Sequence, residues 1–414
     1  MNESVLSVQT VGCGCRFCGG PLAEVVDLGM SPLCESFLAL DQLDAMEPFY
    51  PLKVWVCRHC FLMQLRQYVS AAEIFSEYAY FSSFSDAYIE HARAYAKAVS
   101  VRFGLSGESR VVELASNDGY LLQHFMRLGI PVLGVEPAAN VARAAEAKGV
   151  PTLVRFFSTE LAAGMDKADL VIGNNVLAQV PDLNDFVAGI ARLLKPQGVA
   201  TIEVPHLMRL IQENQYDTIY HEHFSYFSLA TAERIFALHG LTVFDVEEIW
   251  THGGSLRLYL CPADAARPVE RRIAEIKARE AEAGLDRMAG FSRFAEQVRA
   301  SRWNLLDFLI RAKWYGKSIA GYGAPGKGNT LLNYCGIRSD ILDYTVDRNP
   351  YKHGKFLPGT HIPIHPPERI RATRPDYVLI LPWNLRHEIM TSLAYIRDWG
   401  GQFIVPIPDV AVFP

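Results

Sequence analysis

The sequence contains no apolar run long enough to cross a bilayer, no excess of positive charge and no signal-peptide pattern. A membrane-spanning helix takes about 20 consecutive apolar residues, so a protein that crosses a membrane is not expected. The formal net charge is −5, whereas nucleic-acid binding favours a basic surface. The residues after Met1 lack the basic and then apolar order of a secretory leader. We therefore expect a cytoplasmic protein with no nucleic-acid partner and no membrane contact.

The 414-residue chain is long enough for two to four domains, each with a sizeable core. Its apolar content of 50% and charged content of 21% are typical of an ordinary globular protein. Between residues 268 and 300 the composition turns to alanine, glutamate and arginine at helical spacing. This pattern predicts one charged amphipathic helix with a solvated face, linking two domains.

Eight cysteines in a cytoplasmic chain are more often metal ligands or buried thiols than disulfides. Four of them form two CxxC pairs, Cys15 with Cys18 and Cys57 with Cys60. Four thiolates complete a tetrahedral zinc site and leave no open position, so we expect a structural zinc ion and not a catalytic one. Cys13 and His59 are the alternative ligands, whereas the isolated Cys34, Cys261 and Cys335 are expected to be plain core or surface thiols.

The stretch VVELASNDGYLL, residues 111–122, has the pattern of a strand, a tight turn and a helix. Such a unit makes a ligand crevice at the carboxyl end of a parallel sheet. Glu113 lies in the strand, and we expect Asn117 and Asp118 to cap the helix. Gly119 would let a ligand approach the main chain closely.

Three further apolar runs, 132–137, 169–175 and 198–204, predict the next strands of the same sheet. The first of these strands carries Glu136 near its end, about twenty residues after the turn that follows Glu113. A carboxylate at this place typically holds the hydroxyls of a ribose. This arrangement resembles the class I S-adenosylmethionine-dependent methyltransferases, although the usual pattern has glycine where Ala115 stands. A redox Rossmann domain is the alternative. The cofactor-binding residues are predicted to be Glu113, Ala115, Asn117, Asp118, Gly119, Glu136, Pro137, Phe156, Phe157, Asn174 and Asn175.

A second unit of this kind begins at residue 318 with SIAGYGAPGKGNT, which contains GxGxxG and precedes a strand ending in Asp347. It half-matches a P-loop through Gly326 and Lys327, but Gly328 occupies the place of the magnesium-binding hydroxyl. An ATPase or GTPase is therefore not expected. A bound NAD remains the alternative.

Two aromatic segments carry candidate reactive groups. Residues 74–85, IFSEYAYFSSFS, precede a helix expected at 86–103. They form either a hydrophobic staple with a serine cap or a wall from which Tyr78 and Tyr80 enter the crevice. In residues 220–224, YHEHF, the two histidines and the carboxylate permit metal binding, structural hydrogen bonding or acid–base chemistry.

Several motifs occur together in order: the two CxxC pairs, YAYFSS, VVELASNDGYLL, GVEP, NNVLAQVPD, YHEHFSYFS, HGGSLR and GYGAPGKGNTLLNYCGI. Together they resemble the sugar C-methyltransferases that act on nucleotide-linked 4-keto-deoxysugars, over nearly the whole chain. The resemblance implies His223 as a catalytic base, with Tyr220, Glu222 and Tyr78 around the sugar. It also implies that the second Rossmann-like unit helps to hold the nucleotide sugar.

The chemistry of these residues agrees with that implication. Histidine titrates near neutrality and can take a proton from carbon and later release it. A C–H bond next to a ketone is acidic because its anion delocalises onto oxygen, so a base at the carbon and a donor at the oxygen suffice. Some relatives carry histidine where Gln179 stands, and glutamine can only form hydrogen bonds. Gln179 would then orient the sugar, or the substrate differs there.

Helix-start amides after Gly323, with Lys327, would suit a diphosphate. The full set of predicted substrate contacts is Tyr80, Gln179, Gly323, Lys327, Trp383 and Asn384. The expected enzyme adds a methyl group to the carbon next to the ketone of a nucleotide-linked 4-ketosugar, as a monomer or weak homo-oligomer. An NAD-dependent nucleotide-sugar oxidoreductase and a zinc-containing sugar-binding module without chemistry are the alternatives.

We predict an α/β protein with a class I methyltransferase Rossmann core, a small zinc-binding β module before it and a Rossmann-like domain after it. The expected boundaries are 1–73 for the zinc module, 74–265 for the methyltransferase domain, 266–305 for a helical linker and 306–414 for the C-terminal domain.

Overall fold

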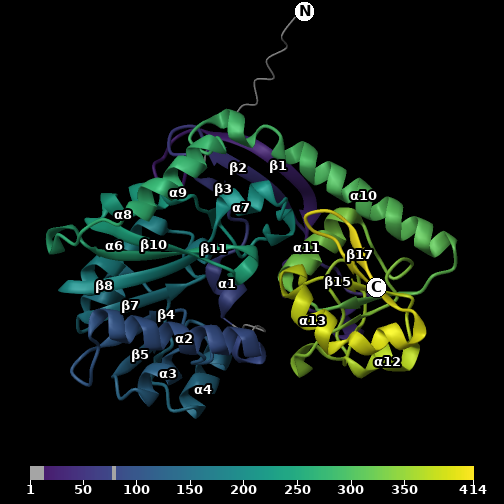
Figure 1. The fold of residues 1–414 in the computed structure, drawn as a ribbon, viewed down its shortest axis with the longest axis horizontal. Coiled ribbons are helices and arrows are strands. Elements are labelled where there is room, and N and C mark those ends of the chain that lie inside the picture. Colours follow the sequence, from purple (N-terminus) through teal and green to yellow (C-terminus); the bar gives the residue numbers. More distant parts are fainter. Residues whose placement is uncertain (1–13, 77–80) are drawn as a thin grey trace, which may run out of the picture.

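The computed structural model describes residues 14–76 and 81–414, which fold into three β-sheets with their helices (Figure 1). The predicted site residues Tyr78 and Tyr80 lie outside the described residues. In Figure 1 the methyltransferase-like unit and the C-terminal unit stand side by side, the N-terminal sheet lies at the top between them, and α10 extends from there over the C-terminal unit. None of the described helices combines the length and apolarity that a membrane span requires.

The N-terminal sheet is antiparallel and has the strand order β1-β2-β3-β9. Its fourth strand comes from far along the chain, directly after the YHEHF segment. The backbone amide of Leu65 also donates to the carbonyl of Phe224 at 3.0 Å. The N-terminal sheet therefore holds the loop that carries His223. The strands are β1 (Leu22–Ser31), β2 (Tyr50–Cys57), β3 (Met63–Leu65) and β9 (Ser225–Tyr226).

The central sheet has seven strands in the order β10-β11-β8-β7-β4-β5-β6, and only β11 runs antiparallel to its neighbours. Its middle strands are apolar and buried because helices cover both faces. The strands are β4 (Val111–Leu114), β5 (Val132–Val135), β6 (Thr152–Leu153), β7 (Ala168–Asn174), β8 (Leu194–Pro205), β10 (Leu241–Ile249) and β11 (Ser255–Pro262). The helices are α1 (Ala71–Phe75), α2 (Asp86–Phe103), α3 (Leu122–Arg127), α4 (Ala139–Ala147), α5 (Thr159–Ala163), α6 (Leu183–Leu193), α7 (Leu207–Gln212) and α8 (Leu229–Leu238).

The helix predicted over residues 268–300 is two helices, α9 (Arg271–Glu282) and α10 (Phe294–Trp314). The chain bends where Gly284 adopts a φ of +84° and lies against Gly290. A β-carbon on Gly290 would stand 2.2 Å from the carbonyl oxygen of Gly284. The prediction of one continuous helix was wrong because glycine in this region permits a turn that helical spacing alone does not reveal.

The C-terminal sheet has the order β14-β13-β12-β15-β16-β17, with only β17 antiparallel. Its core is continuous with the N-terminal sheet, because Val26 and Val54 pack in the same apolar cluster as Phe403. The strands are β12 (Ile319–Tyr322), β13 (Thr345–Val346), β14 (Ile364–His365), β15 (Tyr377–Ile380), β16 (Gln402–Val405) and β17 (Ala411–Phe413). The helices are α11 (Gly326–Cys335), α12 (Glu368–Thr373) and α13 (Arg386–Ser392).

Candidate active site

The four cysteines of the two CxxC pairs converge on one point. Their sulfur atoms lie within 4.8 Å of one another, with Cys15 3.5 Å from Cys60 and Cys18 3.5 Å from Cys57. Tetrahedral zinc with Zn–S bonds of about 2.3 Å separates its sulfurs by roughly 3.8 Å, so the four thiols fit one ion. The amide of the Gln64 side chain donates to Cys15 Sγ at 3.2 Å, which supports a thiolate there. Four sulfur ligands leave no open position, so this is a structural site.

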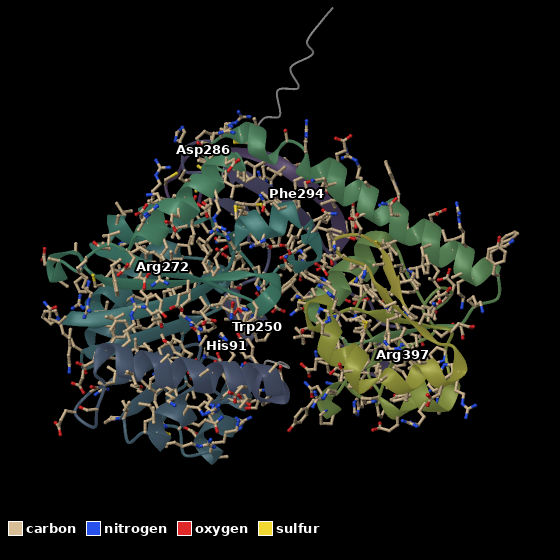
Figure 2. All side chains as sticks on the ribbon, viewed as in Figure 1. His91, Trp250, Arg272, Asp286, Phe294 and Arg397 are labelled. Carbon is tan, nitrogen blue, oxygen red and sulfur yellow. The ribbon has the colours of Figure 1, made fainter. Side chains whose placement is uncertain are left out.

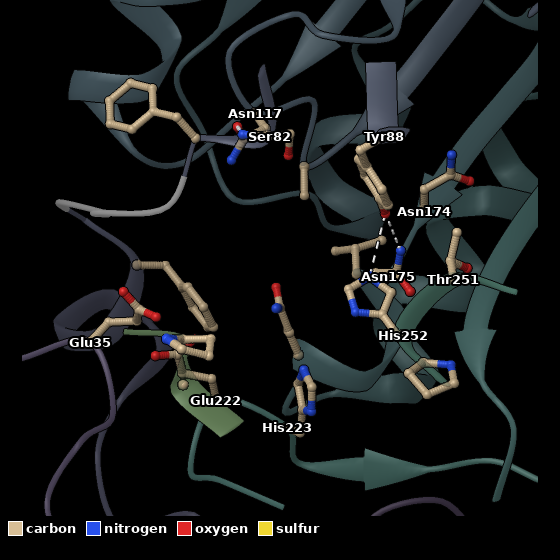
Figure 3. Close-up of a pocket in the computed structure, with 18 of the residues that line it drawn as sticks. Glu35, Ser82, Tyr88, Asn117, Asn174, Asn175, Glu222, His223, Thr251 and His252 are labelled. Atoms are coloured by element: carbon tan, nitrogen blue, oxygen red, sulfur yellow. Dashed lines mark hydrogen bonds between the residues drawn. The ribbon is translucent and has the colours of Figure 1, made fainter. Parts of the chain in front are cut away.

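A cavity of about 590 Å³ opens between the methyltransferase-like unit and the C-terminal unit. Figure 3 shows Glu35, Glu222, His223 and His252 around it, with Asn117, Asn174 and Asn175 towards the carboxyl ends of the central strands. It brings together these predicted site residues: Ala115, Asn117, Glu136, Pro137, Phe156, Phe157, Asn174, Asn175, Gln179, Tyr220, Glu222, His223, Gly323, Lys327 and Asn384.

The nucleoside end of the cavity lies after β4 and β5. Ala115 and Asn117 adopt positive φ angles of +55° and +49°, which make the sharp turn after β4. The backbone amides of Asn117 and Ala138 donate to the two carboxylate oxygens of Glu136, both at 2.9 Å. Burial raises the pKa of Glu136, although these amides oppose the shift.

These groups fit S-adenosylmethionine. The side-chain oxygens of Asn174 and Asn175 are buried and have no hydrogen-bond partner among the described residues. Both residues line the cavity, so these oxygens are acceptors suited to an ammonium or amino group. Phe156 is 45% exposed at the same end, where its ring is available to an adenine base.

Four predicted site residues do not line this cavity. Glu113 is buried within β4, Asp118 pairs with Lys148 at 3.0 Å, and Gly119 faces Val150. Trp383 is also buried, behind Lys327.

The expected cap by Asn117 and Asp118 is wrong, because α3 begins only at Leu122. The side-chain oxygen of Asn117 instead accepts from the backbone amide of Ser82 at 2.9 Å. This bond fastens the segment before α2 to the turn after β4.

His223 has a defined tautomer. Its Nδ1 lies 3.0 Å from the carbonyl oxygen of Thr218, and since a carbonyl can only accept, Nδ1 carries the proton. The Nε2 lone pair is then left for the cavity. Burial, opposed by Thr218 and assisted by the cation of Lys327, lowers the pKa of His223 to about 4. The ring is a neutral base at physiological pH.

Two neighbours of His223 complete this wall of the cavity. The ring of Tyr220 lies 4.1 Å from that of His223 between centroids, and burial raises the pKa of Tyr220 well above its usual range. Glu222 Oε1 accepts a hydrogen bond from Cys34 Sγ at 3.3 Å. Cys34, expected to be a plain thiol, therefore contacts the site.

Lys327 presents a buried cation to the cavity from the C-terminal unit. Its Nζ donates to Asn384 Oδ1 at 2.9 Å and lies 4.8 Å above the ring of Trp383. Trp383 Nε1 in turn donates to Asp217 Oδ2 at 2.6 Å. Burial lowers the pKa of Lys327 and raises that of Asp217 to about 6, and each charge opposes the other's shift.

The glycines of the GxGxxG motif at residues 321–326 pack against protein atoms. A β-carbon on Gly323 would lie 2.5 Å from Pro382 Cδ, and one on Gly326 would lie 2.8 Å from Cys34 Sγ. In a dinucleotide-binding loop the second glycine lets the main chain approach a pyrophosphate. Here that space is filled by side chains, which gives no support to the NAD alternative.

Sequence reasoning missed several residues that line the cavity: Glu35, Tyr88, His252 and Lys352. Glu35 and Lys352 form a buried ion pair at 3.4 Å between the N-terminal and C-terminal parts of the chain. Because the two residues are far apart in the sequence, no local pattern predicts their pairing. The paired glycines after His252 were a usable signal. Arg257, the arginine of the HGGSLR motif, is buried and pairs with Glu203 at 2.6 Å.

Comparison with known families matches three consecutive models to this chain: a putative zinc binding domain at residues 15–75, a methyltransferase domain at 88–246 and a C-methyltransferase C-terminal domain at 250–408. The C-methyltransferase NovU of Streptomyces niveus is 39% identical over 406 residues, covering 96% of each chain. A ubiquinone biosynthesis O-methyltransferase of Rhodopseudomonas palustris is 31% identical over 26% of this chain and 42% of its own. Magnesium protoporphyrin IX methyltransferase from Synechocystis, solved with bound SAH, has 15% identity and a TM-score of 0.35 over 42% of this chain and 82% of its own.

The fold and its cavity are those of a class I S-adenosylmethionine-dependent methyltransferase with a structural zinc module, as the sequence predicts. Within that class, the chain belongs to the C-methyltransferase family that includes NovU. Its methyl acceptor is therefore a carbon atom.

Proposed function

We propose that the protein methylates the carbon next to the ketone of a nucleotide-linked 4-keto-deoxysugar, through an enolate. The observation that carries this proposal is the tautomer of His223, whose Nδ1–H donates to Thr218 while Nε2 keeps its lone pair beside the cavity. A neutral imidazole is the appropriate base for an acidified C–H bond. When bound, S-adenosylmethionine supplies an electrophilic methyl group at the end of the cavity after β4.

In this proposal His223 removes the proton, Tyr220 and Glu222 position the sugar beside it, and Gln179 contributes a hydrogen bond. Lys327 and Asn384 hold the polar, anionic end of the substrate from the C-terminal unit, since a buried cation suits a diphosphate. Because one cavity holds the base, the substrate and the methyl donor together, proximity accelerates the reaction. None of the cysteines among the described residues forms a disulfide, and thiols that bind zinc suit a reducing compartment such as the cytoplasm.

The test is incubation of the purified protein with labelled methyl donor and a panel of nucleotide 4-ketosugars, with products identified by mass. We expect one methyl group on carbon, and His223→Asn should abolish transfer while S-adenosylmethionine binding is retained. A protein that methylates none of the ketosugars, but methylates another carbon acid, would overturn the choice of substrate. Full activity in His223→Asn would overturn the choice of base.

A further inference from the structure

His252 lines the cavity, and the family comparison and the proposed function give it no role. It lies in the turn η5 (Thr251–Gly253) between β10 and β11 and has backbone angles of φ +55° and ψ +22°. A bulky side chain rarely adopts this left-handed conformation, and such strain persists only where the surrounding structure imposes it. The conformation directs the imidazole towards the cavity (Figure 3).

Packing on both following glycines holds this turn. The side-chain amide of Gln215 donates to the carbonyl of Gly253 at 2.8 Å. A β-carbon on Gly253 would lie 2.6 Å from Trp383, and one on Gly254 would lie 3.0 Å from Arg209. Neighbouring Trp250, labelled in Figure 2, lies at the edge of the methyltransferase unit that faces the C-terminal unit. The position of His252 is therefore imposed from both units.

Tyr88 connects His252 to Asn175. The side-chain amide of Asn175 donates to Tyr88 Oη at 2.7 Å, and Tyr88 Oη lies 3.4 Å from His252 Nε2 (Figure 3, dashed lines). A phenol oxygen both donates and accepts, so Tyr88 can accept from Asn175 and give its one proton to Nε2. In that arrangement a neutral ring carries its own proton on Nδ1.

The second nitrogen is available to a ligand. His252 Nδ1 makes no hydrogen bond within the part of the chain that the structure describes, and it faces the open centre of the cavity in Figure 3. Burial, then the cations near it with Lys327 first, lower the pKa of His252 to about 3. The ring therefore remains neutral and acts as a hydrogen-bond donor instead of exchanging protons.

With the proton of His252 on Nδ1, the two imidazoles of this cavity are opposite tautomers. His223 donates through Nδ1 to Thr218 and offers a lone pair on Nε2, whereas His252 would accept from Tyr88 on Nε2 and offer an N–H on Nδ1. Enolisation needs one group of each kind: a base at the carbon and a donor at the oxygen where charge develops. A neutral imidazole can supply that donor without becoming charged.

We propose that His252 is a catalytic residue that donates its Nδ1–H to the carbonyl oxygen of the substrate and stabilises the enolate. The inference rests on the proposed function. The C–H bond breaks and its proton goes to His223 Nε2, while its electron pair forms a carbon–carbon double bond. The carbonyl π electrons move to the oxygen held by His252.

Exchange of the substrate's carbon-bound hydrogen for solvent deuterium, without methyl donor, tests this step directly. The variants are His252→Leu, which lacks the donor, and His252→Asn, whose amide can donate near the position of Nδ1 and tolerates the left-handed conformation. Removal of one such donor typically slows a reaction by about 10²- to 10³-fold. We expect that loss in His252→Leu, substantial recovery in His252→Asn, and unchanged affinity for S-adenosylmethionine in both.

Exchange at the wild-type rate in His252→Leu would overturn the role of His252. If His252→Leu fails to bind S-adenosylmethionine, Tyr88→Phe provides the second test, because it removes the hydroxyl that contacts His252 Nε2 and leaves the imidazole in place. We expect exchange to slow by about tenfold in Tyr88→Phe, the scale of one hydrogen bond, and an unchanged rate would overturn the inference. Failure of the proposed function looks different: the wild-type protein itself would exchange no hydrogen in any ketosugar.

Discussion

The guanidinium of Arg16 donates from Nη1 to the carbonyl oxygen of Pro181 at 2.8 Å. Arg16 lies inside the first CxxC pair, and Pro181 follows the loop that carries Gln179 into the cavity. The other end of the guanidinium donates to the carbonyl of Leu65 at 2.6 Å, and Arg16 Cζ lies 5.3 Å from the centroid of the ring of Phe224, the residue after His223. The zinc module is thereby linked to two loops of the active site.

Arg16→Ala should lower both stability and methyl transfer while leaving zinc in place. The substitution removes hydrogen bonds from a charged donor, each worth about 1.5–3 kcal/mol. Arg16→Lys is the matched control for charge, and it cannot bridge both carbonyls because an ammonium lacks the planar fork. Thermal melts, KM and kcat are the measurements. Wild-type kinetics in Arg16→Ala would contradict the link.

Loss of one zinc ligand should unfold the module locally and abolish activity. Cys18 is the exposed ligand, so Cys18→Ser changes the site with little change in core packing. We expect a chelator to remove zinc from this variant and not from the wild-type protein, because structural zinc contributes directly to folding. Cys261→Ser is the control, since that thiol lies outside the cluster. Metal content is measured by mass spectrometry. Full zinc retention in Cys18→Ser would contradict the assignment.

The rate at which the substrate's carbon-bound hydrogen exchanges with solvent should be the same at pH 5 to 6 as at neutral pH. Only the neutral ring of His223 accepts a proton, and burial together with Lys327 lowers its pKa to about 4. Lys327→Met removes the positive charge and should move the acid limb of the profile to higher pH, whereas Lys327→Arg should leave it in place. The measurement is exchange at saturating substrate between pH 4 and 8. An acid limb near 6.5 in the wild-type protein would contradict this prediction.

The same shift makes folding depend on pH. In the unfolded chain His223 has the ordinary pKa of 6.5, whereas in the folded protein its pKa is about 4. Between these two pH values the unfolded chain binds a proton that the folded protein does not bind. The stability that neutral His223 contributes is therefore complete above pH 6.5 and is lost as the pH falls from 6.5 through about 4. His223→Asn should reduce this part of the pH dependence, as measured by urea unfolding across that range. An identical pH dependence in the variant would contradict it.

Gly326→Ala should destabilise the fold, and adding Cys34→Ala to this variant should restore part of the lost stability. The new β-carbon would meet Cys34 Sγ at 2.8 Å but Cys34 Cβ only at 3.5 Å. Overpacking costs about 1–3 kcal/mol, and removal of the sulfur opens the space. The double variant should therefore be more stable than the sum of the two single effects, as measured in a double-mutant cycle by urea unfolding. Strict additivity would show that the two residues do not touch.

Local patterns predicted those features that depend on neighbouring residues. The 86–103 helix has the predicted bounds, and the two CxxC pairs form the predicted cluster. Local patterns failed where a distant contact or a backbone angle decided the outcome. Thus the helix over 268–300 breaks at Gly284, and Asn117 bonds to Ser82 instead of capping α3.

The sequence by itself determined the class of this protein, because strand, turn and cysteine spacings are properties of adjacent residues. Only the tertiary structure decided which hydrogen-bond partners meet the nitrogens of the two active-site histidines. Those partners are the carbonyl of Thr218 for His223 and the hydroxyl of Tyr88, remote in the chain, for His252. A proton's position on an imidazole follows from the hydrogen bond at its other nitrogen, and no spacing in the sequence encodes that bond.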